Sequence, residues 1–253
     1  KKAIQNSKSI IAVSNDVKDK LVLAGVEHDK IDVIYNGVNI EKNCMLAKCE
    51  PSNINTNDQV FLIGYVGSVQ FSKGIHVLID AVSQLLDENV KCELVIIGEI
   101  PPGGDNNYLQ FLNQKISSTH QGQIKFLGFQ NNVFPHIHSL NVLVLPSIVE
   151  ESFGLVLIEA MSLRKAVIGS NIGGIPEVII HEYNGLLIEP NSLQDLYKAL
   201  KKLIENPEYL LKLGNNGFET VRANYSIIKQ SDMISRNFYR IGAGDLPKNF
   251  EHE

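Results

Sequence analysis

Several features that mark particular classes of protein are scarce or absent in this chain of 253 residues. The formal net charge is -5, and Lys and Arg form no basic stripe, which argues against nucleic acid as a main partner. No apolar run reaches the ~18 residues that a membrane-spanning helix needs. No secretory signal opens the chain, and neither an internal repeat nor a low-complexity tract interrupts it. The remaining composition, 44% hydrophobic and 20% charged, is that of an ordinary globular protein.

Cysteine is also rare, with Cys44, Cys49 and Cys92 as the only three. An odd count indicates reduced thiols and a cytosolic protein. Cys44 and Cys49 have no histidine or second cysteine pair nearby, so free thiols are expected there rather than a metal clip. His136 and His138 are two residues apart on a predicted helix and do not share a face. Because the sequence also has no Asp-x-Asp motif, we predict no metal site.

The most informative stretch joins an apolar run to a predicted helix. Residues 142–145 are all apolar and stop at Pro146, which is typical of a buried strand in a parallel sheet. Residues 154–163 are rich in helix formers and lack proline. Such a helix directs unpaired N–H groups and partial positive charge at the carboxyl edge of the strand, where a diphosphate can bind. The residues expected to bind there, mainly through the backbone, are Ser152, Phe153, Gly154, Leu155 and Val156.

Two carboxylates frame this stretch, Glu151 in the loop and Glu159 in the helix. A carboxylate can accept hydrogen bonds from vicinal hydroxyls, so sugar rings are natural ligands for both. The alternative for an isolated pair at this spacing is a surface glutamate in a loop and another on a helix face, with no ligand.

Strands and helices are predicted to alternate along the chain. This order indicates an α/β fold with a doubly wound, Rossmann-like parallel sheet, whose ligands bind at the carboxyl ends of the strands. The predicted strands cover residues 9–13, 31–35, 61–67, 92–98, 124–129, 142–145, 166–169 and 186–190. The predicted helices cover 15–24, 75–86, 108–118, 133–140, 154–163, 192–205, 207–223 and 225–241, with a short one at Pro176.

A second loop at this edge follows the strand that ends at Gly67. Lys73 precedes the next helix, a position that suits phosphate neutralisation. A solvated surface lysine is an equally good interpretation of its position alone. The loop over residues 99–107 is rich in proline and glycine and longer than a usual connection.

These motifs together resemble the family-four, group 1 retaining glycosyltransferases of the GT-B fold. Glu151 and Glu159 stand as Glu-x7-Glu around Phe-Gly-Leu, as in that family. The resemblance implies that Glu151 lies beside the donor sugar and Glu159 holds the ribose of the nucleotide. Gly67 and Lys73 match the family pattern Gly-Arg-Leu-x-x-x-Lys-Gly, but Ser68 occupies the position of the arginine that grips the diphosphate with the lysine. That departure is expected to weaken donor binding and leaving-group stabilisation.

The resemblance also assigns the remaining candidate residues. The loop after Gly98 borders the nucleotide in this family, and a mobile loop without ligand contact is the alternative. The backbone after a similar Leu-Gly contacts the nucleobase, which places Phe129 and Asn131 near the base; Phe129 in the core is nearly as good an interpretation. A Gly-Gly-x-Pro-Glu motif packs beside the donor pocket, and for Glu177 we expect only a role in that tight turn.

The resemblance covers the second half of a GT-B enzyme. It implies the end of an N-terminal acceptor domain in residues 1–40, a linker in 41–59 and a nucleotide-sugar-binding domain in 60–224. It also implies that a helix in 225–241 crosses back onto the N-terminal domain. From their polar composition, residues 242–253 are expected to form a disordered tail. The chain has no initiator methionine, so we expect either a truncation of a full enzyme or one of two chains that assemble.

The activity implied for the parent enzyme is transfer of a hexosyl group from a nucleoside-diphosphate sugar to an acceptor hydroxyl, with retention. The nucleotide sugar is a substrate, and no cofactor is expected. The acceptor, a glycan or lipid-linked saccharide of cell-surface synthesis, would bind the missing domain. The expected location is cytoplasmic, including peripheral association with the inner face of the membrane. The alternative function is a non-catalytic nucleotide-sugar-binding or partner subunit; a GT-B epimerase fits the motifs less well.

Overall fold

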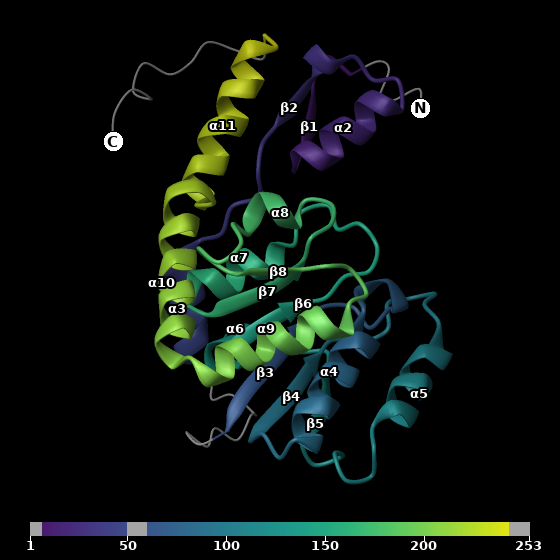
Figure 1. Ribbon diagram of the computed structural model, residues 1–253. Coiled ribbons are helices and arrows are strands. Elements are labelled where there is room, and N and C mark those ends of the chain that lie inside the picture. Colours follow the sequence, from purple (N-terminus) through teal and green to yellow (C-terminus); the bar gives the residue numbers. More distant parts are fainter. Residues whose placement is uncertain (1–6, 50–59, 243–253) are drawn as a thin grey trace.

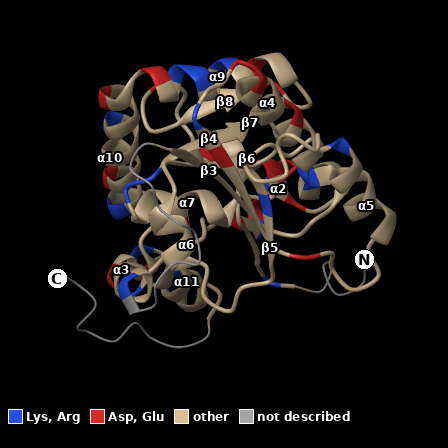
Figure 2. Ribbon diagram, turned by 90° about the horizontal axis from the view of Figure 1, so that it is seen from below, with Lys and Arg blue, Asp and Glu red and all other residues tan. Residues whose placement is uncertain are grey.

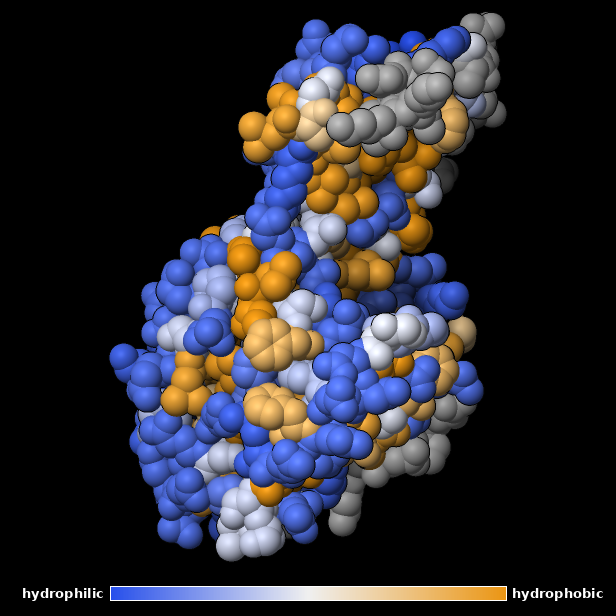
Figure 3. Space-filling model, turned by 90° about the vertical axis from the view of Figure 1, so that its right-hand side faces the viewer, coloured by the Kyte–Doolittle hydropathy of each residue, from blue (hydrophilic) through white to orange (hydrophobic). Residues whose placement is uncertain are grey.

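The computed structural model describes residues 7–49 and 60–242. A larger body is built on one parallel sheet with helices on both faces, and a smaller lobe lies above it (Figure 1). Seen from the side, the smaller lobe is joined to the body through a narrow waist (Figure 3).

The sheet of the larger body has six parallel strands in the order β5-β4-β3-β6-β7-β8. Strand order reverses between β3 and β6, which creates a switch point where ligands bind in folds of this kind. All four residues of β6 are buried, as expected for a strand covered on both faces. The predicted α/β class is therefore confirmed. The strands are β3 (Phe61–Val66), β4 (Cys92–Ile97), β5 (Ile124–Gly128), β6 (Val142–Leu145), β7 (Ala166–Ser170) and β8 (Leu186–Ile188).

Helices cover both faces of this sheet (Figure 1). On one face α4 (Ile75–Asp87) packs against α5 (Asn106–Lys115) and α9 (Leu193–Glu205). The other face carries α6 (Phe134–Ser139) and α7 (Leu155–Ser162), and α10 (Pro207–Asn224) packs against α7. The aliphatic side chains of α4 that face the sheet are buried, and Leu86 near its end is partly exposed. The short helices are η1 (His28–Lys30), η2 (Phe71–Lys73) and α8 (Ile175–Val178).

The predicted linker contains a helix that was not foreseen. Residues Ile40–Cys49 form α3, which packs against α6 and α7 on the sheet's second face. Asn43 is buried and donates to the Ser162 hydroxyl at 3.0 Å. This part of the linker therefore belongs structurally to the larger body. Residues 50–59 of the linker and 243–253 of the predicted tail lie outside the described residues.

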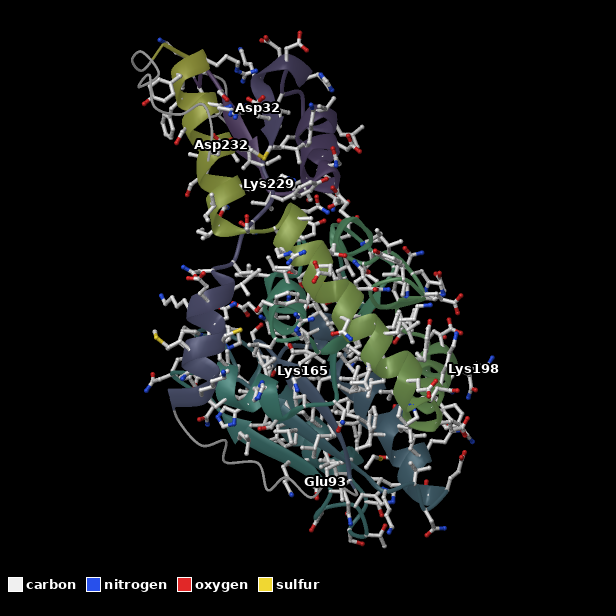
Figure 4. All side chains as sticks on the ribbon, turned by 90° about the vertical axis from the view of Figure 1, so that its left-hand side faces the viewer. Asp32, Glu93, Lys165, Lys198, Lys229 and Asp232 are labelled. Atoms are coloured by element: carbon white, nitrogen blue, oxygen red, sulfur yellow. The ribbon has the colours of Figure 1, made fainter. Side chains whose placement is uncertain are left out.

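The smaller lobe consists of β1 (Ile10–Ala12), α2 (Asn15–Leu23) and β2 (Ile31–Val33). Its two strands are parallel. The last helix, α11 (Ile227–Arg240), runs from the body to this lobe (Figure 1). Asn237 donates to Asp32 at 2.6 Å, and Arg240 also binds the Asp32 carboxylate, which faces α11 (Figure 4).

Glu177 of α8 fixes the smaller lobe to the body. Its Oε2 accepts hydrogen bonds from the Asn15 backbone N–H at 2.8 Å and from the Tyr35 hydroxyl at 3.0 Å. Its Oε1 accepts from the Asp16 N–H at 2.9 Å, so one carboxylate binds the N-terminus of α2. The expectation that Glu177 only serves a tight turn is therefore wrong. Burial opposes ionisation, but these hydrogen bonds lower the pKa of Glu177.

An aromatic cluster lies next to this carboxylate. The Tyr35 and Phe153 rings are stacked with centroids 6.0 Å apart, and Tyr225 contacts both rings edge-on at 5.6 and 5.7 Å. The Tyr225 hydroxyl donates to the Glu177 carbonyl at 2.6 Å, and burial raises the pKa of Tyr225 to about 12. The segment after β2, the loop before α7 and the end of α10 thus share one apolar contact.

We predict that Glu177→Ala lowers the free energy of unfolding by about 1–3 kcal/mol, because several N–H and O–H donors lose their acceptor. Glu177 has a depressed pKa in the folded state, so its contribution is present above its unfolded pKa near 4.5 and is lost as the pH falls below that value. Urea denaturation of the wild type and of Glu177→Ala at pH 7 measures the loss, and the same experiment with the wild type and Glu177→Gln between pH 3 and 7 measures the pH dependence. An equal acid-dependent loss in both proteins would contradict the prediction.

Candidate functional site

The loops at the carboxyl edge of the sheet are joined to one another by backbone hydrogen bonds. Gly67 donates to the Ile97 carbonyl at 3.0 Å, and Gly98 donates to the Gly128 carbonyl at 2.9 Å. Gly98 has a φ of +136°, and a Cβ there would lie 1.9 Å from the Gly67 oxygen. No other residue fits this position without moving the backbone. The loops after β3, β4 and β5 therefore form one continuous wall.

A cavity of about 310 Å³ opens between these loops. It brings together the predicted residues Gly67, Ser68, Gly98 and Phe129. The Phe129 side chain is 63% exposed, so its placement in the core is wrong. Asn131 is exposed and does not line the cavity; Gln130 does so instead. The other lining residues are Val66, Ile97, Glu99, Pro101 and Val133.

Ser68 is held from two sides. The Tyr65 hydroxyl donates to the Ser68 carbonyl at 2.7 Å, and the Gln70 side-chain amide donates to the Ser68 hydroxyl at 2.7 Å. Tyr65 is fully buried, and burial together with the Glu151 carboxylate raises its pKa. A tyrosine that stays protonated keeps the hydroxyl proton that it donates to the Ser68 carbonyl.

Lys73 and Glu151 form an ion pair across the switch point. Lys73 ends η2 after β3, and Glu151 follows β6, so the pair joins the loops of two adjacent strands. Their side chains are only 25% and 20% exposed, which rules out a solvated surface lysine. The Ser147 hydroxyl also donates to Glu151 at 3.4 Å. The structure thus brings into contact the lysine predicted to neutralise the diphosphate and the glutamate predicted to lie beside the donor sugar.

A close backbone approach keeps these two loops together. The Ile148 N–H donates to the Ser72 carbonyl at 2.9 Å. Gly74 has a φ of +68°, and a Cβ there would lie 2.0 Å from the Pro146 oxygen. Glycine is therefore required immediately after Lys73 for the loops to meet.

The first turn of α7 presents free donors at this edge. Gly154 has a φ of +84° and precedes the helix, and its carbonyl accepts from the Leu157 N–H at 2.9 Å. Within the described part of the chain, the N–H groups of Gly154, Leu155 and Val156 donate to no residue. The Phe153 side chain belongs to the aromatic cluster, so only its backbone can serve a ligand. Ser152 is exposed beside it.

The glycine pair of the Gly-Gly-x-Pro-Glu motif packs directly on the Glu151 loop. Gly174 donates to the Glu151 carbonyl at 2.7 Å. A Cβ on Gly173 would lie 2.3 Å from that same oxygen, and one on Gly174 would lie 2.3 Å from the Ser152 oxygen. Glu150, on the other side, pairs with Lys20 of the smaller lobe at 2.7 Å. The Glu151 loop is therefore fixed on both flanks.

Glu159 lies in α7, where burial raises its pKa to about 7. Its carboxylate has no ion-pair or hydrogen-bond partner among the residues that the structure describes. A partly buried acid without a compensating donor costs folding free energy whenever it is ionised. This arrangement is typical of a functional position, where a ligand supplies the missing partners.

We predict that Glu159→Gln is more stable than the wild type by about 1–3 kcal/mol at pH 8 and equally stable at pH 4.5. The folded-state pKa is raised, so the folded state holds a proton that the unfolded state releases, and wild-type stability falls as the pH rises from 4.5 to 7. Urea denaturation at the two pH values measures the difference. A variant that is less stable than the wild type at pH 8 would show that the carboxylate has a stabilising partner.

Charge distribution, metal-ligating side chains and helix length, in the part of the chain that the structure describes, indicate no nucleic-acid site, metal site or membrane-spanning helix. Acidic and basic residues are mixed over the outer helices (Figure 2). Within residues 7–49 and 60–242, no three His, Cys, Asp or Glu residues gather where they could hold a metal ion. None of the helices described there has the length and apolar character to cross a membrane.

The fold and the arrangement of these loops define a class, the Rossmann-like half of a GT-B protein. The chain belongs to the family described as Glycosyl transferases group 1, whose model matches residues 49–220. A second model, Glycosyltransferase Family 4, matches residues 1–42. The glycosyltransferase family expected from the motifs is confirmed.

Curated relatives agree with this assignment. An uncharacterised glycosyltransferase of Methanocaldococcus jannaschii is 32% identical over 225 residues, which cover 86% of this chain and 56% of the relative. The capsular polysaccharide biosynthesis glycosyltransferase CapM of Staphylococcus aureus is 28% identical and is matched over 86% of this chain and 57% of its own length. The chain thus spans a little over half the length of these relatives.

Among solved structures, Anabaena HepE in complex with UDP and glucose superposes with a TM-score of 0.85. It is 25% identical, and the match covers 94% of this chain and 64% of HepE. Sucrose-phosphate synthase of Thermosynechococcus elongatus superposes with a TM-score of 0.81 at 24% identity, which shows a shared fold.

Proposed function

We propose that this chain is the donor-binding half of a retaining hexosyltransferase, which moves a hexosyl group from a nucleoside-diphosphate sugar to an acceptor hydroxyl. The observation that carries the proposal is the meeting of free α7 amides with the Lys73–Glu151 pair at the switch point of the sheet. Oriented amides and a cation together suit a diphosphate, and the carboxylate beside them suits sugar hydroxyls.

In this proposal the diphosphate competes with Glu151 for Lys73. The Lys73 ammonium group and the amides of Gly154, Leu155 and Val156 stabilise the negative charge that develops on the departing diphosphate. Release from Lys73 frees the Glu151 carboxylate to accept donor-sugar hydroxyls and to steady positive charge at the anomeric carbon. No metal or other cofactor is part of the proposed reaction.

The nucleoside is proposed to occupy the cavity beside this pair. Phe129 offers an exposed ring at the base end, and Gly67 and Gly98 line the same cavity. Glu159 accepts hydrogen bonds from the ribose hydroxyls, which supply the partners that its carboxylate otherwise lacks. HepE, with UDP and glucose bound, supports a nucleotide-sugar donor here.

The proposed acceptor and location of the parent protein are supported by a relative of the chain. CapM acts in capsular polysaccharide biosynthesis, which supports an acceptor glycan or lipid-linked saccharide of the cell surface. We propose that an N-terminal domain outside this sequence binds that acceptor, in the cytoplasm or at the inner face of the membrane.

A second candidate function is a nucleotide-sugar-binding or partner subunit without catalytic activity. Ser68 favours it, because serine offers a neutral hydrogen bond where the resembled family has an arginine. A hydrogen bond to a charged group is worth about 1.5–3 kcal/mol, so this change weakens the grip on the leaving group.

We expect isothermal titration calorimetry to detect binding of uridine or guanosine diphosphate, and Lys73→Ala to weaken that binding at least tenfold through loss of the cation. Lys202→Ala is the matched control, because Lys202 pairs with Glu182 on the exposed surface of α9. Folded wild-type protein that binds neither nucleotide would contradict the proposed function.

Ser68→Arg should tighten binding of the same nucleotide about tenfold, because a guanidinium adds a charge-assisted hydrogen bond to the diphosphate. The same titration measures it, with the nucleoside that lacks phosphates as the control ligand. If Ser68→Arg left the affinity for the nucleoside diphosphate unchanged, the bound diphosphate would lie away from Ser68, contrary to the prediction.

A further inference from the structure

A hydrogen-bonded side-chain pair in the cavity wall has no role in the proposed function so far. Gln70 donates from Nε2 to the Ser68 hydroxyl oxygen at 2.7 Å, and both side chains are partly buried. Ser68 lines the cavity directly after Gly67, in the same loop that ends in Lys73. The Tyr65 hydroxyl donates to the Ser68 carbonyl at 2.7 Å, so this backbone contact does not depend on the Gln70 side chain.

The direction of the Ser68 proton follows from this contact. A hydroxyl has one proton and two acceptor lone pairs, and the Gln70 amide occupies one lone pair. The hydroxyl proton therefore cannot point back at that amide nitrogen. No other residue in the described part of the chain accepts it. The Ser68 hydroxyl proton is therefore available to a ligand in the cavity that Ser68 lines.

We propose that Gln70 is a positioning residue, which acts through Ser68 to aim its hydroxyl proton at a phosphate oxygen of the bound nucleoside diphosphate. The inference rests on the proposed function and deepens it. In the resembled family a charged arginine at this position binds the diphosphate. Here the neutral Ser68–Gln70 pair would replace part of that interaction with an oriented hydroxyl donor. Phosphate is the favoured partner because the loop between Gly67 and Lys73 faces the anion that Lys73 neutralises.

Whether the N–H or the carbonyl of the Gln70 amide faces the Ser68 hydroxyl decides whether Gln70 favours or opposes phosphate binding. If the Gln70 carbonyl accepted the Ser68 proton instead, the hydroxyl would present only lone pairs to the anion and would repel it. Gln70→Glu separates the two cases, because a carboxylate can only accept. It would draw the Ser68 proton away from the ligand.

The test is calorimetric titration of UDP and of uridine, or of the guanosine pair if GDP binds more tightly. The proteins are the wild type, Ser68→Ala, Gln70→Ala, Gln70→Glu and the double Ser68→Ala/Gln70→Ala variant. We expect Ser68→Ala to weaken diphosphate binding about tenfold and Gln70→Ala about threefold. In the Ser68→Ala background, Gln70→Ala should change nothing further. Gln70→Glu should weaken diphosphate binding at least as much as Ser68→Ala does.

The nucleoside without phosphates should bind all five proteins alike, and thermal unfolding should show that each is folded. Gln114→Ala, at an exposed glutamine of α5, is the control and should bind like the wild type. Additive losses in the double variant, wild-type affinity in Gln70→Glu, or equal losses for the nucleoside would each overturn the inference. Absence of nucleotide binding by the wild type would instead remove the proposed function, and this inference with it.

Discussion

The ion pair between Lys73 and Glu151 is the contact on which the rest of the site depends. It forms because strand order reverses between β3 and β6, which brings together the ends of two strands far apart in the sequence. Gly74 allows the loops to approach, and its φ of +68° admits no ordinary side chain at low cost. The pair neutralises itself when no ligand is bound. A diphosphate that takes the lysine leaves a carboxylate ready for sugar hydroxyls.

Around this pair the protein loses folding stability at polar groups whose missing hydrogen-bond partners a ligand would supply. The first amides of α7 lack acceptors in the described chain, and burial keeps the pKa of Glu159 near 7. The surrounding elements compensate for these costs. The sheet is apolar on both faces, and Glu177 and the aromatic cluster of Tyr35, Phe153 and Tyr225 hold the smaller lobe against the Glu151 loop.

Local patterns predicted the elements well, because burial imposes a period that the sequence displays. The apolar run of β6 and the helices α4 and α2 all appear where expected. Helix α3 was missed because its residues are polar and mixed and only weakly amphipathic. Long-range contacts left no local signal: Glu177 reaches Asn15 across 162 positions. Gln70 was missed for another reason, since a neutral polar residue in a loop matches no motif.

The central claim is that the first turn of α7 and Lys73 receive a diphosphate, and amide chemical shifts test it most directly. In ¹H–¹⁵N spectra of the labelled protein titrated with UDP or GDP, the account predicts the largest shifts at Gly154, Leu155 and Val156. The neighbouring residues of the loop that ends in Lys73 should follow. Saturable shifts confined to other parts of the molecule, with these amides unmoved, would contradict it.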